Sequence, residues 1–572
     1  MKQTLKNLFC LALLASSSAA IADCGSGSCG VASGSGNSTE CCFPEAYNIN
    51  NNGNVFGQTN FTAHPVQWDQ FRRMAGASTE KLHLFGEEEF YGVASLALQY
   101  QQTTDGGRIA QWFSFAGASS PNSGASNGKM TYGPDADDTT QTYTDINSLN
   151  FGVTASGSIS FCPRIQNFIA DIDLFFGWDE FVCGLWSRFS IPINWTRWNL
   201  GLQETVSAAG SSVYQAGVVA TAQTNVVYTN MTDAWNGDLP FGQAPVLKKG
   251  RINGHQDETA VAGLKMELGY DFMRREKSHL ALSFMVVAPT GNKPDATYLF
   301  DAVSGSSKSW EIGGDINAHW NFWEKQECNQ SLGLHFDVAL MGQLKASQTR
   351  LFSLKSGGAS TSPVSANACT VLNPGSSWLL LKKVSGGAAG AAPTSVVGLE
   401  RAANILALES KIGAGFETNG AVLVKYIRNH FSFDLGYELY YRNAESLSGR
   451  DSIAALTYAV YGITDDAAVG ASAAAWNTNV SQSTSSIRTP GAVESGTSFV
   501  YVQDSDVCEC SALQPAYLSN KVFGFAEYSW DNCDWEPTLG LGASYEIGAS
   551  KSGAKNVALN QWSVLAKGSI SF

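Results

Sequence analysis

The sequence predicts an all-β protein: a transmembrane, antiparallel up-and-down β-barrel of about 16 strands (range roughly 14–18) with long extracellular loops. Three observations carry this prediction: an export signal, apolar and polar residues that alternate over ten or more positions, and aromatic residues spaced ten apart on the apolar faces. Alternation with a period of two is typical of strands, and runs of this length exceed most soluble strands. The sequence has no apolar run long enough for a membrane-spanning helix.

Residues 1–22 have the features of a cleaved Sec signal peptide. Two lysines precede an apolar core from Leu8 to Leu14, and small residues follow. The apolar core is too short to span a bilayer, which disfavours an uncleaved anchor. We therefore expect an exported protein in the outer membrane of a Gram-negative-type bacterium. Residues 23–88 are predicted to form a Cys/Gly/Ser-rich periplasmic segment, and residues 89–572 the barrel.

Alternation is clearest from Leu332 to Leu344, where every second residue is apolar or glycine and the residues between them are mostly polar or small. The same pattern begins at Leu264 and at Phe431. Helical spacing would mix the two sets of residues, so these segments are interpreted as strands. The predicted strands are 89–101, 109–117, 150–161, 165–176, 181–192, 194–205, 262–273, 277–289, 308–323, 331–346, 404–427, 430–442, 521–531, 536–548 and 558–572.

Aromatic residues mark the ends of two apolar faces. Trp310 and Trp320 lie ten residues apart on one face, and Trp562 and Phe572 repeat the spacing in the last segment. Ten strand residues at about 3.3 Å each, tilted by about 40°, rise roughly 25 Å, which matches the apolar band between the aromatic girdles of a transmembrane barrel. A large soluble sandwich with long strands is the alternative.

The long inserts predict which end of each strand faces outward. Even numbers of strands separate the inserts, so all of them fall on one side of the membrane, and a periplasmic C-terminus makes that side extracellular. The short turn at Cys162-Pro163-Arg164 is then periplasmic. Fifteen strands are one too many or one too few for an even barrel, and the uncertainty lies before residue 118. Residues 62–76 could form a short periplasmic or plugging helix, because Pro65 lies near a helix start.

Eleven cysteines remain after signal-peptide cleavage, and disulfides persist in exported proteins. The cysteines lack the spacing of a zinc site, so cross-links within the chain or to neighbouring molecules are favoured. An odd number leaves at least one thiol unpaired or shared between molecules. The disulfide candidates are Cys24, Cys29, Cys41, Cys42, Cys162, Cys328 and Cys533, predicted to be periplasmic, and Cys369, Cys508 and Cys510, predicted to lie in outer loops.

The chain ends in Ser569-Ile570-Ser571-Phe572, an alternating strand with a terminal Phe. This end resembles the C-terminal signal by which the barrel-assembly machinery recognises outer-membrane β-barrels. With the signal peptide, the strands and the cysteines, it gives a resemblance in type to the cysteine-rich major outer-membrane proteins of chlamydiae, porins in a disulfide-linked envelope. The resemblance implies outer-membrane lipid, the assembly machinery and homo-oligomeric or disulfide-linked neighbours as partners. No motif aligns, so no functional residue is carried over.

Charged residues of both signs occupy the faces predicted to point inward, as in a water-filled lumen. The sequence therefore predicts a porin, a passive channel for small hydrophilic solutes and ions. Acidic residues outnumber basic ones, which favours mild cation preference. A lumen closed by salt bridges or a plug is the alternative. The pore-lining candidates are Lys265, Glu267, Asp271, Glu311, Asp315, His319, His335, Asp337, Lys345, Glu409, Lys411, Asp434, Glu438, Arg442 and Lys567.

Other function classes find less support. A net charge of −14 without a basic stretch argues against nucleic-acid binding. His319 and His335 occupy adjacent predicted strands and could face each other, but the sequence contains no H-E-x-x-H metalloprotease motif. We expect no enzyme, no cofactor and no metal. The competing function is a barrel-anchored surface adhesin or structural envelope protein with an occluded lumen, for which the long inserts provide material.

Overall fold

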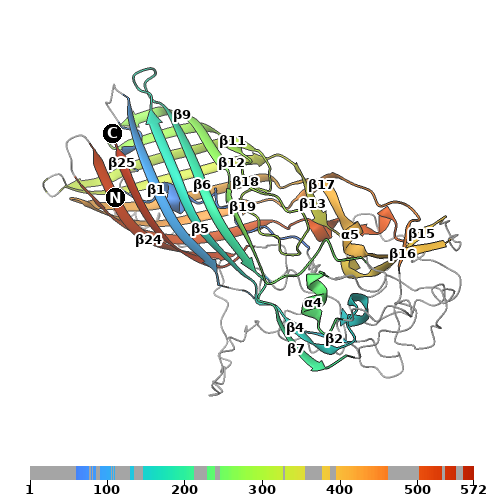
Figure 1. The fold of residues 1–572 in the computed structure, drawn as a ribbon. Coiled ribbons are helices and arrows are strands. Elements are labelled where there is room, and N and C mark those ends of the chain that lie inside the picture. The colour runs from blue at the N-terminus through green and yellow to red at the C-terminus, as the bar shows by residue number, and fades with distance from the viewer. Residues whose placement is uncertain are drawn as a thin grey trace, which may run out of the picture. The chain divides into compact units, whose positions relative to one another are not determined.

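The computed structural model describes residues 59–572, except 77–78, 80, 85–89, 105, 107–108, 110–128, 134–145, 211–227, 239–244, 326, 328, 355–375, 387–394, 461–500, 531–534 and 549–557. Twelve strands form a closed antiparallel barrel, in which each strand pairs with the next and the last pairs with the first (Figure 1). In the described part of the chain, no helix has the length and apolarity needed to cross a membrane. The barrel strands are β1 (Tyr91–Thr103), β5 (Arg164–Gly177), β6 (Leu185–Asn199), β9 (Leu264–Arg275), β10 (Ser278–Ala288), β11 (Glu311–Lys325), β12 (Gln330–Gln343), β18 (Gly415–Arg428), β19 (Phe431–Arg442), β23 (Tyr517–Ser529), β24 (Glu536–Gly548) and β25 (Gln561–Ser571).

The barrel closes where the C-terminal strand meets the first strand. β25 and β1 pair without interruption from Ser571 opposite Val93 to Gln561 opposite Thr103. The N–H of Phe572 then donates to the carbonyl of Gly92 at 3.0 Å, and the N–H of Gly92 donates to the carbonyl of Phe572 at 2.8 Å. Because the barrel is closed, it has no edge strand with unpaired backbone groups. A lipid environment requires this, since lipid offers no partner for such groups.

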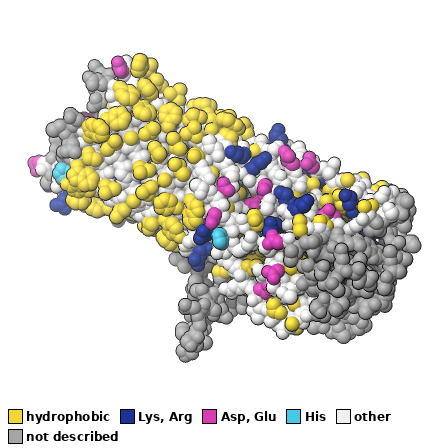
Figure 2. Space-filling model, viewed as in Figure 1, with side chains coloured by type: hydrophobic (Ala, Val, Ile, Leu, Met, Phe, Trp, Pro, Cys, Tyr) yellow, Lys and Arg dark blue, Asp and Glu magenta, His cyan; other side chains and the backbone are white. Residues whose placement is uncertain are grey.

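The predicted alternation places apolar side chains on the outside of the barrel and polar ones inside. Leu268, Phe284 and Leu435 are 56%, 58% and 64% exposed, whereas Glu267 and Asp434, on the same strands as two of them, are buried. Figure 2 shows hydrophobic side chains spread over the outer surface of the strands. This distribution is the reverse of that in a soluble barrel and is the one expected in a bilayer. The predicted girdle residues Trp310, Trp320 and Phe572 are exposed, and Trp562 is half-buried.

The prediction of about 16 strands is wrong, and the error lies in the N-terminal third. The predicted strands 181–192 and 194–205 overlap a single strand, β6, which spans 15 residues. β6 is this long because it pairs with β9 from Leu185 to Ser190 and then with β8 (His255–Val261), which lies outside the ring of twelve. The predicted strand 150–161 yields only β4 (Ser156–Ser160), in a separate sheet with β2 (Lys129–Gly133), β3 (Ile146–Asn147) and β7 (Gln203–Ala208). The predicted strand 109–117 falls almost entirely outside the described residues.

Because the barrel has fewer strands before β5 than predicted, β5 runs in the opposite direction across the barrel from the predicted one. Short connections such as 276–277 and 429–430 define one end of the barrel, here called the turn end, and the long inserts define the loop end. Cys162 precedes β5 at the loop end, so its predicted periplasmic turn is on the wrong side; Cys162 is disulfide-bonded. Cys183, which the sequence analysis did not select, lies at the turn end with an exposed thiol. Cys508 and Cys510 lie in the loop-end insert 443–516 as predicted, and the remaining disulfide candidates, Cys24, Cys29, Cys41, Cys42, Cys328, Cys369 and Cys533, lie outside the described residues.

The loop-end inserts form small sheets rather than extended loops. Trp235 from the insert between β6 and β9, and Trp378 and Leu406 from the insert between β12 and β18, belong to one hydrophobic cluster with Phe61 and Trp68 from inside the barrel. The other elements are β13 (Ala346–Leu351), β17 (Ala407–Gly413) and β20 (Ser446–Arg450) in one sheet, β16 (Ser395–Arg401), β15 (Leu380–Ser385) and β21 (Tyr458–Val460) in a second, the pair β14 (Ser353–Leu354) and β22 (Val507–Cys508), and the helices α4 (Met231–Asn236) and α5 (Ala402–Leu406).

Gly542 on β24 allows the barrel wall to pack closely. A Cβ atom there would lie 2.5 Å from the carbonyl oxygen of Gly524 and 2.9 Å from Cζ of Phe71. Because that oxygen belongs to a barrel strand, we expect Gly542→Ala to lower the free energy of unfolding by about 1–3 kcal/mol. Heat-modifiable electrophoretic migration in detergent measures the change. Gly524→Ala, where the nearest atom is 3.6 Å away, is the control, and equal losses in both variants would contradict the prediction.

Candidate functional site

A segment of the chain before β1 occupies the barrel lumen. It comprises the described residues from Thr59 to Leu84, which leave out 77, 78 and 80, and we call it the plug. At the loop end, the N–H of Thr59 donates to the carbonyl of Ser511 at 3.0 Å. At the turn end, Nδ1 of His83 lies 3.0 Å from Oδ2 of Asp271. The sequence predicts a periplasmic segment for this part of the chain, whereas these residues lie inside the barrel and contact its strands.

The centre of the plug is a single helical turn, α2 (Gln70–Met74), and all five of its residues are buried. Asp69 caps its start by accepting a hydrogen bond from the N–H of Phe71 at 3.0 Å. The helix ends before Gly76, whose φ of +103° suits a residue without a Cβ atom. The sequence analysis expected a short, potentially plugging helix within residues 62–76, and α2 lies there.

Arg73 binds three carboxylates from three strands. Its Nε donates to Asp337 at 2.8 Å, and its Nη2 donates to Glu267 at 2.9 Å and to Asp315 at 3.3 Å. All four side chains are buried. Carboxylates this close together and away from water repel one another, so the guanidinium is what allows them to share one level of the wall.

Arg72 reaches the opposite side of the barrel. Its Nε donates to Asp171 on β5 at 3.2 Å, and its Nη1 donates to the side-chain oxygen of Gln99 on β1 at 2.5 Å. In the closed ring, β1 lies directly across from β12, which carries Asp337, one of the partners of Arg73. The two consecutive arginines therefore fasten α2 to both sides of the lumen.

The wall also binds the plug backbone. Nζ of Lys567 donates to the carbonyls of Arg72 and Ala75 at 2.9 and 2.7 Å, and the N–H of Gly76 donates to Asp434 at 2.7 Å. Lys425 donates to the carbonyl of Gly76. Carbonyls at a helix C-terminus lack intrahelical donors and carry partial negative charge, so lysines suit this position.

Each of the twelve barrel strands has at least one residue in contact with the plug. The plug is therefore enclosed by the wall rather than resting against one side of it. The wall residues that touch it through hydrogen bonds, ion pairs or ring stacking are Gln99 on β1, Asp171 on β5, Arg188 on β6, Glu267 on β9, His279 on β10, Asp315 on β11, Asp337 on β12, Lys425 on β18, Asp434 on β19, Lys521 on β23, Glu546 on β24 and Lys567 on β25.

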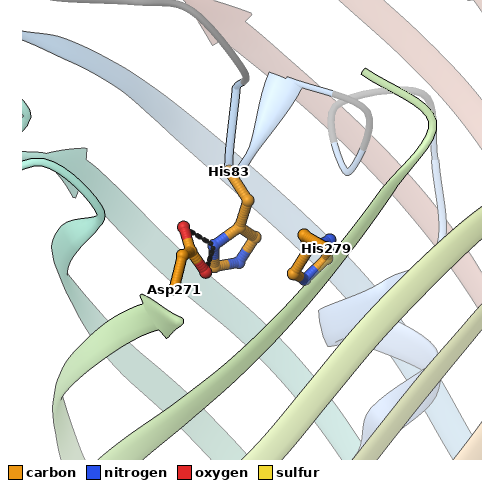
Figure 3. A group of neighbouring side chains, drawn as sticks. All are labelled: His83, Asp271 and His279. Carbon is orange, nitrogen blue, oxygen red and sulfur yellow. Dashed lines mark hydrogen bonds and ion pairs between the residues drawn. The ribbon is translucent and has the colours of Figure 1, made fainter. Parts of the chain in front are cut away.

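Four histidines gather near the turn end of the lumen. His279, His319 and His335 are direct cross-strand neighbours on β10, β11 and β12. The ring of His83, from the plug, stacks on that of His279 with the centroids 4.2 Å apart. Figure 3 shows His83 between the carboxylate of Asp271 and the ring of His279. The proposed proximity of His319 and His335 is confirmed, with ring centroids 5.6 Å apart.

Most of the predicted pore-lining residues lie on the inner face of barrel strands, although there they contact the plug or one another. The predicted strand 404–427 divides at Ala414 into β17 and β18. Glu409 and Lys411 therefore lie on β17, outside the barrel, and are exposed. Lys345 follows the end of β12, and His319 is partly buried on β11. The eleven buried candidates are Lys265, Glu267, Asp271, Glu311, Asp315, His335, Asp337, Asp434, Glu438, Arg442 and Lys567.

Sequence reasoning missed the partners that close the lumen. Arg72, Arg73, His83 and His279 were not selected, because a plug held by distant strands has no periodic pattern of its own. The one available signal was the pair of adjacent arginines in a segment otherwise suited to a short helix.

No family profile matches the sequence, and no curated protein matches it. Similar solved structures include an outer membrane channel from Pseudomonas putida F1, with 8% identity, a TM-score of 0.34, and coverage of 86% of this chain and 99% of that chain. A FadL homologue from Pseudomonas aeruginosa has 10% identity and a TM-score of 0.25, covering 90% and 99%. The translocator domain of NalP from Neisseria meningitidis has 6% identity and a TM-score of 0.27, covering 88% and 94%. The barrel assignment rests on the strand pairing, since TM-scores this low add no argument.

Replacing Arg73 by methionine should loosen the plug. Removing one partner of a buried ion pair typically costs about 3–5 kcal/mol, and here three carboxylates lose their cation. We expect trypsin to cleave Arg73→Met after Arg72 faster than it cleaves the wild type in detergent, with mass spectrometry identifying the fragments. Arg197→Met, which breaks an exposed pair with Asp257, should digest like the wild type. A plug that stays as resistant as the wild type would refute this role of Arg73.

Proposed function

We propose that the protein is an outer-membrane channel closed by its own plug, which conducts small hydrophilic solutes and ions when the plug is displaced. The observation that carries the proposal is the polar contact between the plug and the barrel wall: ion pairs and hydrogen bonds reach the plug from around the ring. Apolar packing alone would suit a permanent core. Charged wall side chains can instead be stabilised in two ways: by the plug when the lumen is closed, and by water once the plug leaves.

The outer-membrane location belongs to this proposal. It is supported by the apolar outer face of the barrel and by the position of Phe572 within the closing ladder. Recognition by the barrel-assembly machinery and disulfide linkage to neighbouring molecules, as in the chlamydial proteins, stay predictions from the sequence.

A barrel-anchored adhesin or structural protein is the second candidate function. The enclosed plug favours it, because a closed lumen needs no transported solute. The hydrophobic cluster shared by the loop-end inserts and the plug favours it too, since it gives the inserts a defined structure for contact with a partner. Conductance distinguishes the two functions, because an anchor would show no channel steps even when the plug contacts are weakened.

Substituting both plug arginines should open the channel. We expect wild-type protein in planar bilayers to show rare openings, and the double variant Arg72→Gln/Arg73→Gln to raise the open probability on the order of 100-fold, equivalent to about 3 kcal/mol. Arg197→Gln, outside the lumen, is the matched control and should behave like the wild type. If neither the wild type nor the double variant conducts, although both migrate as folded barrels, the channel proposal fails and the anchor is favoured.

The open channel should prefer cations. Without the plug, the strand residues facing the lumen comprise twelve carboxylates and seven cationic groups, and a surplus of one sign selects the opposite ion. Reversal potentials under a KCl gradient should therefore give a K⁺ permeability above that of Cl⁻ in the double variant; anion selectivity would contradict it. The acidic residues are Asp171, Asp173, Glu267, Asp271, Glu311, Asp315, Asp337, Glu417, Asp434, Glu438, Glu527 and Glu546, and the basic ones are Arg188, Lys265, Arg274, Lys425, Arg442, Lys521 and Lys567.

A further inference from the structure

We propose that the histidine cluster at the turn end of the lumen binds a divalent transition-metal ion such as Zn²⁺, with His83, Asp271 and His279 as ligands. Seven histidines occur in the chain, and four of them meet at this one place. The sequence predicts no metal, because its cysteines and histidines lack the spacing of a metal site. The barrel register and the plug bring the four histidines together.

The three proposed ligands have suitable donor atoms. One nitrogen or oxygen from each of His83, Asp271 and His279 lies within 4.8 Å of the other two. Zinc bound by histidine and carboxylate has metal–ligand distances of about 2.0–2.2 Å, so binding would draw the three atoms closer and turn the stacked rings of His83 and His279 toward the ion. The side chains are buried, and each comes from a different element: the plug, β9 and β10. Figure 3 shows them facing one another.

His319 is placed to act as a fourth ligand. Its Nδ1 faces Nδ1 of His279 in direct contact, while Nε2 of His279 lies 2.9 Å from Oδ1 of Asn317. If Nε2 of His279 donates to Asn317, the neutral ring directs a lone pair from Nδ1 toward His319. Two ring nitrogens can face each other in this way by sharing a proton or by binding a common cation. A metal ion would satisfy both nitrogens.

The surrounding charge favours a cation. Near the cluster, the carboxylates outnumber the cationic groups by six to four, so this end of the lumen has a surplus of negative charge. The carboxylates are Asp173, Asp179, Glu267, Asp271, Asp315 and Asp337, and the cationic groups are those of Arg73, Arg188, Lys265 and Arg274.

The type of ligand determines the type of metal. Imidazole nitrogens with one carboxylate suit Zn²⁺, Ni²⁺ or Cu²⁺, whereas Ca²⁺ and Mg²⁺ prefer sites made only of oxygen ligands. The backbone of His83 adopts a φ of 57°, in the left-handed region that few residues other than glycine occupy. A residue other than glycine keeps a left-handed backbone conformation only where the surrounding contacts hold it there, and such residues often occur at ligand sites.

Metal binding would fasten the plug to the wall. His83 belongs to the plug and the other ligands to barrel strands, so one ion would cross-link the two. This consequence rests on the proposed function, because it makes the ion a brake on channel opening. The metal site itself does not depend on channel activity, and direct binding tests it separately.

The experiment uses the mature chain refolded in detergent, stripped with EDTA and titrated with Co²⁺, whose visible absorption reports nitrogen and oxygen coordination, followed by displacement with Zn²⁺. We expect one ion per chain, with an intense visible band typical of four-coordinate Co²⁺. His279→Gln and Asp271→Asn should each weaken binding by on the order of 100-fold, because each loses a ligand. His255→Gln, at an exposed histidine on β8, should bind like the wild type.

Two outcomes would overturn the metal site. One is a wild-type chain that binds no Co²⁺ or Zn²⁺ in the micromolar range. The other is unchanged binding in both ligand variants when their electrophoretic migration shows folded barrels. Conductance is then measured with and without Zn²⁺. Binding without an effect on conductance would keep the site and remove its role in gating, whereas the absence of conductance in every variant would count against the proposed function alone.

Discussion

The ion pairs of Arg73 are the contacts on which the closed lumen depends. Glu267, Asp315 and Asp337 project from β9, β11 and β12 to one level of the lumen, and each is buried. A guanidinium has five donors in a planar fork, which lets one side chain serve several carboxylates at once; a lysine ammonium lacks this geometry. The plug therefore does more than fill space, because it supplies the charge that the wall lacks.

The strand number explains why one segment of chain is enough to close the lumen. A barrel of about eight strands is filled by its own side chains, and one of about 16 to 18 leaves an aqueous channel. Twelve strands give an intermediate interior, wide enough for a single helical turn and its side chains. The sequence predicts inward charges in a water-filled lumen, with closure by salt bridges or a plug as the alternative, and in the structure many of these charges pair with the plug.

Much of the barrel could be predicted because the signal is local. The bilayer forces every lipid-facing position to be apolar, so alternation alone located β24 at its observed bounds and β19 within one residue of them. The same signal failed at β6, where alternation continues beyond the barrel because the strand goes on to pair with β8. The plug could not be derived in this way. Its wall partners lie from 27 to 495 residues away in the chain, and only the closed ring brings them to Arg72 and Arg73.

The way in which the wall holds α2 has a consequence for opening. A helix of five residues is far below the length at which an isolated helix is stable in water, so this one exists because the wall satisfies it. Lys567 binds the carbonyls of Arg72 and Ala75 at its C-terminal end, and Lys425 and Asp434 bind the carbonyl and the N–H of Gly76, just beyond it. Once these contacts are lost, nothing maintains the helix, and the plug regains conformational entropy as it leaves. Displacement and unfolding of α2 are therefore one event, and the gained entropy offsets part of the energy of the broken ion pairs.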